Sequence, residues 1–231
     1  MARNKHPEQT VQHILTVAAQ LFTEKGYEKT SIQDILDALG MSKGAIYHHF
    51  KSKDEILNAV MEQQFAYSAR MLDQLVVDTT AATAREKLVH ILEHVLSDPQ
   101  AHSLDRVLQT QIKNPVFIVR GIQQAVQLDA PVIADILREG IKDGSISTSD
   151  PEATAEVFMM LVNIWINPAI FGRTIADTKQ RLNFLQSLMR TLGADIVNNE
   201  LIERILIHHK EIGAFVTDEN DGGSKNEGAY D

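Results

Sequence analysis

Residues 31–53 read SIQDILDALGMSKGAIYHHFKSK, and this stretch contains the start and stop signals of two short helices. Ser31, with Asp34 three residues later, has the spacing of a capping box, and Gly40 stands where the first helix should end. Ser42 is placed to cap a second helix of about two turns. Because a short turn containing Gly40 joins the two helices, the stretch predicts a helix-turn-helix.

The second short helix is a basic island in an acidic chain. Residues 42–53 contain three lysines and no acid, whereas the whole chain has a net charge of -9. The first sixty residues hold seven Lys/Arg and seven Asp/Glu, so residues 61–231 carry the entire deficit. A basic segment of this kind suits a polyanion. Ser52 and Glu55 then form a further capping box that begins the next helix.

Apolar residues recur at helical spacing along most of the chain, and no segment has the alternation of a strand. One helix precedes the stretch, from about Val11 to Gly26, and a long one follows it from Asp54 towards Val77. Residues 157–166 are apolar on nearly every side, which predicts a helix buried on two faces. The sequence therefore predicts an all-α fold of about nine or ten helices, with later ones near 82–97, 103–113, 116–129, 131–142, 151–166, 182–192 and 201–206.

The predicted organisation has three parts. Residues 1–54 form a three-helix, helix-turn-helix DNA-binding domain, and a long helix joins it to a larger helical domain, 55–212. Residues 217–231 are polar, acidic and Gly-rich, and we expect residues 213–231 to form a disordered tail. The absence of cysteine excludes disulfides and thiolate zinc sites, and no apolar run approaches the roughly 20 residues of a membrane span. We expect a cytoplasmic protein with no membrane partner.

A helix-turn-helix contacts base edges through residues near the start of its second helix. Lys43 is long enough to reach guanine or a phosphate, Gly44 lets the backbone approach closely, and Ala45 can touch a thymine methyl. Ile46 and Phe50 point inward, which leaves Tyr47 and His48 on the outer side. The predicted DNA-contacting residues are Thr30, Ser31, Ser42, Lys43, Gly44, Ala45, Tyr47, His48 and Lys53, with Thr30, Ser31 and Lys53 on phosphates. The alternative is that these lysines are only the solvated face of a helical bundle.

From Ala18 to Leu57 the sequence follows the pattern AxxLFxEKGYEKTSIQDILDALGMSKGAIYHHFKSKDEIL, which resembles the DNA-binding segment of the TetR family of bacterial transcriptional regulators. The resemblance covers about residues 10–60. It implies a homodimer held by the last two long helices of each chain as a four-helix bundle, bound to a palindromic double-stranded DNA operator. It also implies a small-molecule effector, of unknown identity, whose pocket lies in the larger domain and moves the helix beginning at Asp54.

Large apolar groups interleaved with amides are the expected walls of such a pocket. The predicted ligand-binding residues are Phe117, Met159, Met160, Asn163, Trp165, Asn167 and Phe171. The alternative for each is ordinary core or dimer interface, because an apolar helical stripe usually packs inside a fold.

His90, Glu93 and His94 match the HxxEH spacing of a group of zinc peptidases. A metal-dependent sensor or enzyme is the hypothesis that follows, with His102 as a further ligand of a regulatory metal. We favour an ordinary amphipathic helix, and assign no metal, cofactor or catalytic residue. The favoured function is a ligand-responsive transcriptional regulator, most simply a repressor, and not an enzyme. The alternative is a protein-interaction module whose short helices dock on a partner protein.

Overall fold

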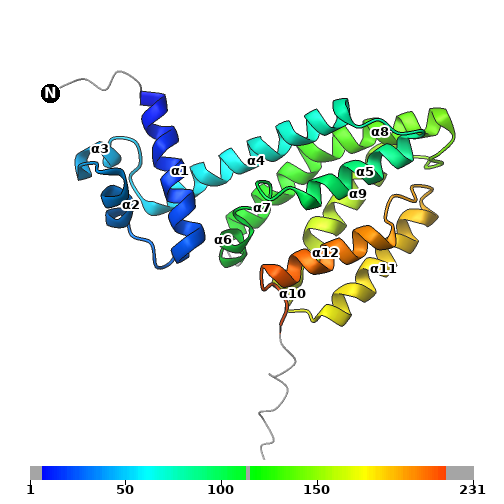
Figure 1. The fold of residues 1–231 in the computed structure, drawn as a ribbon. Coiled ribbons are helices and arrows are strands. Elements are labelled where there is room, and N and C mark those ends of the chain that lie inside the picture. Colours follow the sequence, from blue (N-terminus) through cyan, green and yellow to red (C-terminus); the bar gives the residue numbers. More distant parts are fainter. Residues whose placement is uncertain (1–6, 113–114, 217–231) are drawn as a thin grey trace, which may run out of the picture.

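The computed structural model describes residues 7–112 and 115–216, and within these ranges the chain is helical with no strand (Figure 1). When α7–η1–α8 and α9–η2 are each counted as one helix, the described part has eleven, against the nine or ten expected. The elements are α1 (Pro7–Lys25), α2 (Ile32–Leu39), α3 (Lys43–Tyr47), α4 (Lys53–Asp78), α5 (Ala84–Ser97), α6 (Asp105–Thr110), α7 (Pro115–Gln124), η1 (Ala125–Asp129), α8 (Ala130–Asp143), α9 (Pro151–Met160), η2 (Leu161–Trp165), α10 (Pro168–Phe171), α11 (Ile175–Thr191) and α12 (Asn199–Glu211).

The helix boundaries around α2 follow the local signals in the sequence. Gly26 and Gly40 have φ angles of +85° and +62°, the left-handed conformation that ends a helix with least strain at glycine. The capping box of Ser31 is confirmed, since its Oγ accepts from the Asp34 amide at 3.1 Å and its own amide donates to Asp34 Oδ2 at 2.8 Å. These bonds satisfy amides that α2 itself cannot satisfy.

The helix α3 differs from its prediction in two ways. It has five residues, less than the two turns expected, and the Ser42 hydroxyl makes no capping hydrogen bond. The chain leaves the helix early and places Phe50 in the same core as Ile46. At the next helix the Glu55 carboxylate accepts from the Lys51 amide at 2.6 Å, so the expected box with Ser52 is only half formed.

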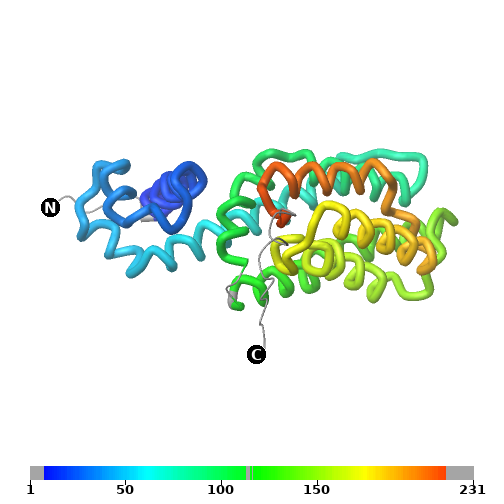
Figure 2. Tube along the Cα trace, turned by 90° about the horizontal axis from the view of Figure 1, so that it is seen from below, coloured from blue at the N-terminus to red at the C-terminus, as the bar shows by residue number. Residues whose placement is uncertain are grey.

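Two apolar cores lie at opposite ends of the molecule, and α4 runs between them (Figures 1 and 2). The smaller core joins α1, α2, α3 and the first half of α4, and it also contains Leu104 and Val107 from the start of α6. The larger core joins α5, α8, α9, α11 and α12, and Leu72 and Leu75 of α4 pack against it. The predicted boundary at residue 54 therefore falls at the start of a helix that serves both domains.

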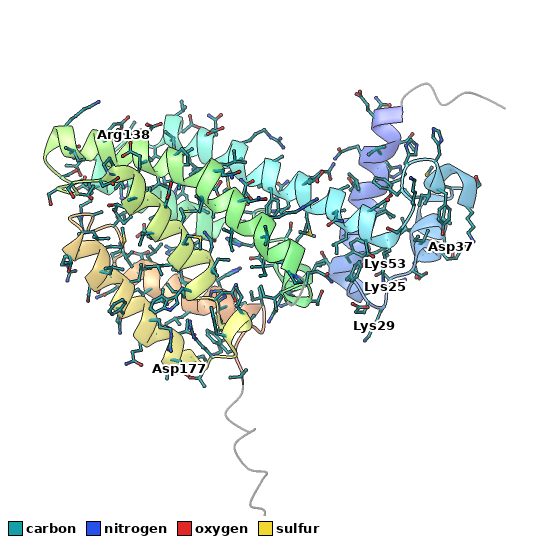
Figure 3. All side chains as sticks on the ribbon, turned by 180° about the vertical axis from the view of Figure 1, so that it is seen from behind. Lys25, Lys29, Asp37, Lys53, Arg138 and Asp177 are labelled. Carbon is teal, nitrogen blue, oxygen red and sulfur yellow. The ribbon has the colours of Figure 1, made fainter. Side chains whose placement is uncertain are left out.

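Pro131 does not break the helix that contains it, which corrects the predicted stop at 129. The chain passes from α7 into α8 through the π-helical turn η1, where the Ala130 amide donates to Ala125 O. A π turn admits an extra residue and changes the register of the hydrogen bonds, so it accommodates the amide that proline lacks. Further along α8, Arg138, which Figure 3 labels, pairs with Glu152 of α9.

The C-terminal helix α12 buries its apolar stripe inside the same chain, against α5 and α11. The packed chain continues past the predicted boundary at 212, because Ala214 is buried and the Val216 amide donates to Arg173 O at 3.1 Å. The rest of the predicted tail, 217–231, lies outside the described residues. Among the described helices, none has both the length and the apolar character of a membrane span.

The prediction that the apolar helix α9–η2 is buried on two faces was wrong for the single chain. Phe158 and Ile166 are buried, but Val157 on the other side is 39% exposed. The neighbouring helix α11 exposes 58% of Phe184. Two adjacent helices thus leave large apolar side chains at the surface.

Candidate nucleic-acid interface

The short helix α3 presents a polar and basic outer face. Ile46 is fully buried and fixes the helix against the smaller core, so that Lys43 and His48 face solvent and Tyr47 is 42% exposed. The Lys43 ammonium lies 5.7 Å from the centre of the Tyr47 ring, a cation–π distance. Because 42–53 contains no acid, nothing within this segment neutralises the positive charge.

Gly44 faces open space in the first turn of α3. A Cβ built at this position would meet nothing within 4 Å, so the packing of the chain does not require glycine here. Glycine inside a helix is about 0.5–1 kcal/mol less stable than alanine. The glycine thus costs helix stability but leaves the backbone open to the close approach of another molecule.

The flanking residues differ in how many hydrogen-bonding groups they leave for a phosphate. Ser42 is exposed and its hydroxyl makes no capping bond, whereas the Ser31 hydroxyl is held by Asp34. Lys53 donates to Tyr27 O at 2.8 Å and lies 4.2 Å from the centre of the Tyr27 ring. One N–H of the Lys53 ammonium is used in that bond, and two remain for other acceptors.

Tyr27 holds the ammonium group of Lys53 in place. Burial, together with its hydrogen bond to Asp54, raises the pKa of Tyr27 well above the usual value, so the phenol stays protonated and donates to that carboxylate. The ring therefore offers Lys53 a neutral aromatic face, and the Tyr27 carbonyl offers it an acceptor.

Thr30 does not reach the surface, which corrects its predicted phosphate contact. Its side chain is 1% exposed, and the hydroxyl donates to Gly26 O at 2.9 Å, a carbonyl at the end of α1. The exposed cation beside it is Lys29, which was not among the predicted contacts although it lies only two residues before Ser31 of the capping box. Figure 3 labels Lys25, Lys29 and Lys53 at one end of this domain.

Lys25 is already paired with an acid of α2. Its ammonium lies 2.9 Å from Asp34 Oδ1, and hydrogen bonds from Ser31 and Lys25 hold the pKa of Asp34 well below its ordinary value. Asp34 is therefore ionised at any physiological pH, and Lys25 is less available to DNA than Lys43.

The seven predicted pocket residues do not all pack against the same core. Phe117 packs against the smaller core, whereas Met159 and Trp165 pack against the larger one. Asn167 caps α10, and the Arg173 guanidinium lies 4.3 Å from the centre of the Phe171 ring. The exposed Asn163 donates to the Met159 carbonyl, and Met160 is half-buried. Two surface hollows, one near Ser147 and Thr191 and one near Ala82 and Glu139, contain none of the seven.

The HxxEH match has no metal-site geometry. His90 and His94 are both exposed on α5, and Glu93 accepts a hydrogen bond at 3.0 Å from Asn198, the capping residue of α12. Glu93 therefore joins two helices, and the pattern in the sequence is that of an ordinary amphipathic helix.

Comparison with known proteins agrees with this geometry. The family model described as "Bacterial regulatory proteins, tetR family" matches residues 14–60, which span α1, α2, α3 and the start of α4. Residues 14–60 are a TetR-family DNA-binding segment. The TetR-family match thus covers the helix-turn-helix and the buried positions that orient α3.

Relatives extend the likeness beyond the TetR-family segment. The transcriptional regulator AcrR of Shigella flexneri is 32% identical over 141 residues, 56% of this chain and 64% of the length of AcrR. The transcriptional repressor AcnR of Corynebacterium glutamicum is 26% identical over 195 residues, 82% of this chain and 97% of AcnR. Both relatives are named as HTH-type transcriptional regulators, and neither name describes an enzyme.

Solved structures share the whole fold. A TetR-family regulator from Pectobacterium atrosepticum superposes with a TM-score of 0.59 at 24% identity, over 83% of this chain and 98% of that one. A regulator from Cytophaga hutchinsonii gives 0.60 at 16% identity, over 89% and 95%. The larger helical domain, where sequence patterns alone are weak, thus has the fold of known regulators.

Proposed function

We propose that the chain is a ligand-responsive repressor that binds a palindromic operator as a homodimer in the cytoplasm and leaves it when a small-molecule effector binds. One observation supports the DNA contact above all others: Gly44, in an acid-free basic helix, faces open space. Ser42, Lys43, Tyr47 and His48 surround it on the same exposed surface, which we call the reading surface. Ser31, Ala45 and Lys53 lie at its margin.

Within this proposal the larger domain pairs the two reading surfaces. The exposed apolar residues of α9–η2 and α11 support a dimer face, because a second copy would remove them from water. The two helices lie side by side: the Trp165 and Phe184 rings are 5.9 Å apart, and Val157 and Thr191 border one hollow. The resemblance implied the last two long helices, but α12 keeps its apolar stripe inside the chain, so the supported pair is α9–η2 with α11.

Effector response then requires a link between the two cores. The helix α4 belongs to both, and α6 contributes Leu104 and Val107 to the smaller one. An effector would release DNA only to the extent that it binds better to the arrangement in which the two reading surfaces are wrongly spaced.

Selection from a pool of random DNA duplexes tests the proposal. Purified full-length protein should enrich a motif with two-fold symmetry, because a two-fold dimer places two identical reading surfaces on one duplex. Binding should weaken steeply with salt, as phosphate contacts release counterions. A pool with no enriched sequence would contradict the proposal, and salt-insensitive binding to a protein partner would favour the interaction module instead.

A further inference from the structure

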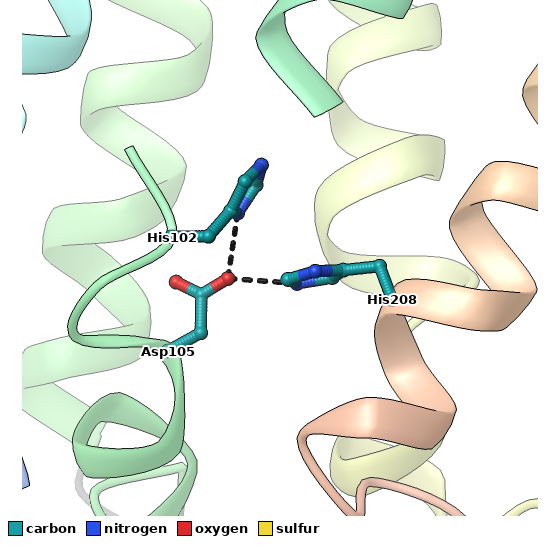
Figure 4. A group of neighbouring side chains, drawn as sticks. All are labelled: His102, Asp105 and His208. Atoms are coloured by element: carbon teal, nitrogen blue, oxygen red, sulfur yellow. Dashed lines mark hydrogen bonds and ion pairs between the residues drawn. The ribbon is translucent and has the colours of Figure 1, made fainter. Parts of the chain in front are cut away.

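Three polar side chains from distant parts of the chain meet between α6 and α12. His102 precedes α6, Asp105 begins it, and His208 lies near the end of α12, 103 residues beyond Asp105 (Figure 4). Asp105 Oδ2 lies 2.7 Å from His102 Nδ1 and 2.8 Å from His208 Nε2. One ligand atom from each residue lies within 4.8 Å of the other two. We call these three residues the His–Asp–His cluster.

The hydrogen bonds of His102 leave it one partner short as a neutral ring. Its Nδ1 faces Asp105 Oδ2, and its Nε2 lies 3.0 Å from the carbonyl oxygen of Val95, so both nitrogens face acceptors. A neutral imidazole has a single N–H and can satisfy only one of them. With that N–H on Val95 O, the lone pair of Nδ1 points at a carboxylate, an arrangement that either a proton on Nδ1 or a metal cation between the two groups would satisfy. A backbone carbonyl that fixes the far nitrogen is also a usual support of a metal-bound histidine.

We propose that His102, Asp105 and His208 bind one divalent transition-metal ion, of the class of Zn²⁺ or Co²⁺, between α6 and α12. Two imidazoles and a carboxylate suit such ions. Ligand atoms about 2.0–2.1 Å from a tetrahedral zinc lie about 3.3 Å apart, so the two contacts with Asp105 would have to open by roughly half an ångström. All three side chains are partly exposed, and water can complete the coordination.

The charge state of Asp105 suits a ligand. Burial alone would raise the pKa of Asp105, but the hydrogen bonds from His102 and His208 lower it overall. The carboxylate is therefore ionised at neutral pH. His209, next to His208, is not a member of the cluster: burial lowers its pKa to about 4, and its Nδ1 is buried with no hydrogen-bond partner among the described residues.

The position of the ion would matter for the DNA-binding domain. On one side of α6, Arg106 donates to Glu211 O and Gln109 to Gly213 O, both at 2.9 Å, so the helix already contacts the end of α12. On the other side, Leu104 and Val107 are buried in the smaller core. A metal ion bound by both His208 and Asp105 would connect α12 to α6, the helix that packs against α1 and α4. The metal would thereby change DNA affinity, a consequence that rests on the proposed function.

Metal titration of untagged full-length protein, stripped with a chelator, tests the site itself. Zn²⁺ competed against a chromophoric chelator should bind one ion per chain, and Co²⁺ should give the visible absorption of a tetrahedral site. Asp105→Asn, which keeps the shape of the side chain, and His208→Ala should each weaken Zn²⁺ at least about tenfold, since even partners beyond the ligands typically contribute 10–100-fold. Circular dichroism would establish that both variants fold.

The matched control is the double variant His90→Ala/His94→Ala, which removes two exposed histidines outside the cluster and should bind Zn²⁺ like the wild type. A wild type that binds no Zn²⁺, or a control that loses as much affinity as His208→Ala, would overturn the site. Operator binding with and without Zn²⁺ tests the regulatory step separately. Zn²⁺ bound at the cluster with no change in operator affinity would overturn the regulation and leave the site standing.

Discussion

The two domains differ in what they leave on the surface. The smaller one buries its apolar residues and exposes a basic face around Gly44, whereas the larger one exposes Val157 and Phe184 from two adjacent helices. An exposed basic face suits a polyanion, and an exposed apolar face suits a second copy of the chain. The groups that each domain leaves exposed thus indicate the kind of partner that suits it.

Replacing Val157 and Phe184 together by Asp should have the largest effect. Two charges on the apolar face would prevent its burial, so the protein should sediment as a monomer and operator affinity should fall at least about 100-fold, because a dimer gains that much from bivalent binding. Ile207→Asp is the control, since Ile207 is 55% exposed on α12 and lies outside the proposed face. If the double variant still sediments as a dimer, the exposed apolar residues of α9–η2 and α11 do not form the dimer face.

Lys43→Ala should lower operator affinity by about 1–3 kcal/mol with no change in thermal stability. Titrations at several salt concentrations separate its two roles: loss of a phosphate contact reduces the salt slope by about one, and loss of a base contact relaxes specificity at one position. The exposed Lys142 of α8 provides a control, Lys142→Ala, of equal charge change. Equal affinities for Lys43→Ala and wild type would show that the reading surface is misplaced.

Gly44→Ala should give the smallest effect, and it should change stability and DNA affinity in opposite directions. The free energy of unfolding should rise by about 0.5–1 kcal/mol, because alanine favours the helix, while operator affinity falls as the methyl group separates the backbone from DNA. Gly121 of α7 also has nothing within 4 Å of an added Cβ. Gly121→Ala should therefore stabilise the fold and leave DNA binding unchanged. Denaturant unfolding and gel-shift titrations would check both, and a Gly44→Ala variant that binds like wild type would contradict the close approach.

The sequence predicted the caps and turns that depend on neighbouring residues, and it missed the features that depend on how the helices pack. Gly26, Gly40 and the Ser31 capping box were predicted correctly, because a turn or a cap depends on residues a few positions apart. Thr30 was misplaced because its burial depends on how α1 and α2 pack. Likewise, the predicted stop before Pro131 failed because a π turn accommodates the missing amide.

The His–Asp–His cluster shows the same limit at the level of a site. The histidine spacing on α5 drew attention to His90 and His94, which prove to be exposed, and His102 was named only as a further ligand beside them. Nothing in the sequence paired His102 with Asp105 and His208, because His208 lies 103 residues beyond Asp105. Only the packing of α12 beside α6 brings them together. The seven pocket candidates were selected by composition, and composition does not distinguish a cavity wall from the core.

The helix α4 makes the molecule sensitive to very small movements. At 1.5 Å per residue its 26 residues span about 39 Å without interruption, with one end in each core. If the larger core holds one end, a tilt of about 5° displaces the other by about 3.4 Å, which equals the rise of one base-pair step. In a dimer the two displacements add or cancel according to symmetry. A rearrangement near the larger core that is too small to disturb its packing is therefore enough to shift α3 by one step along the groove.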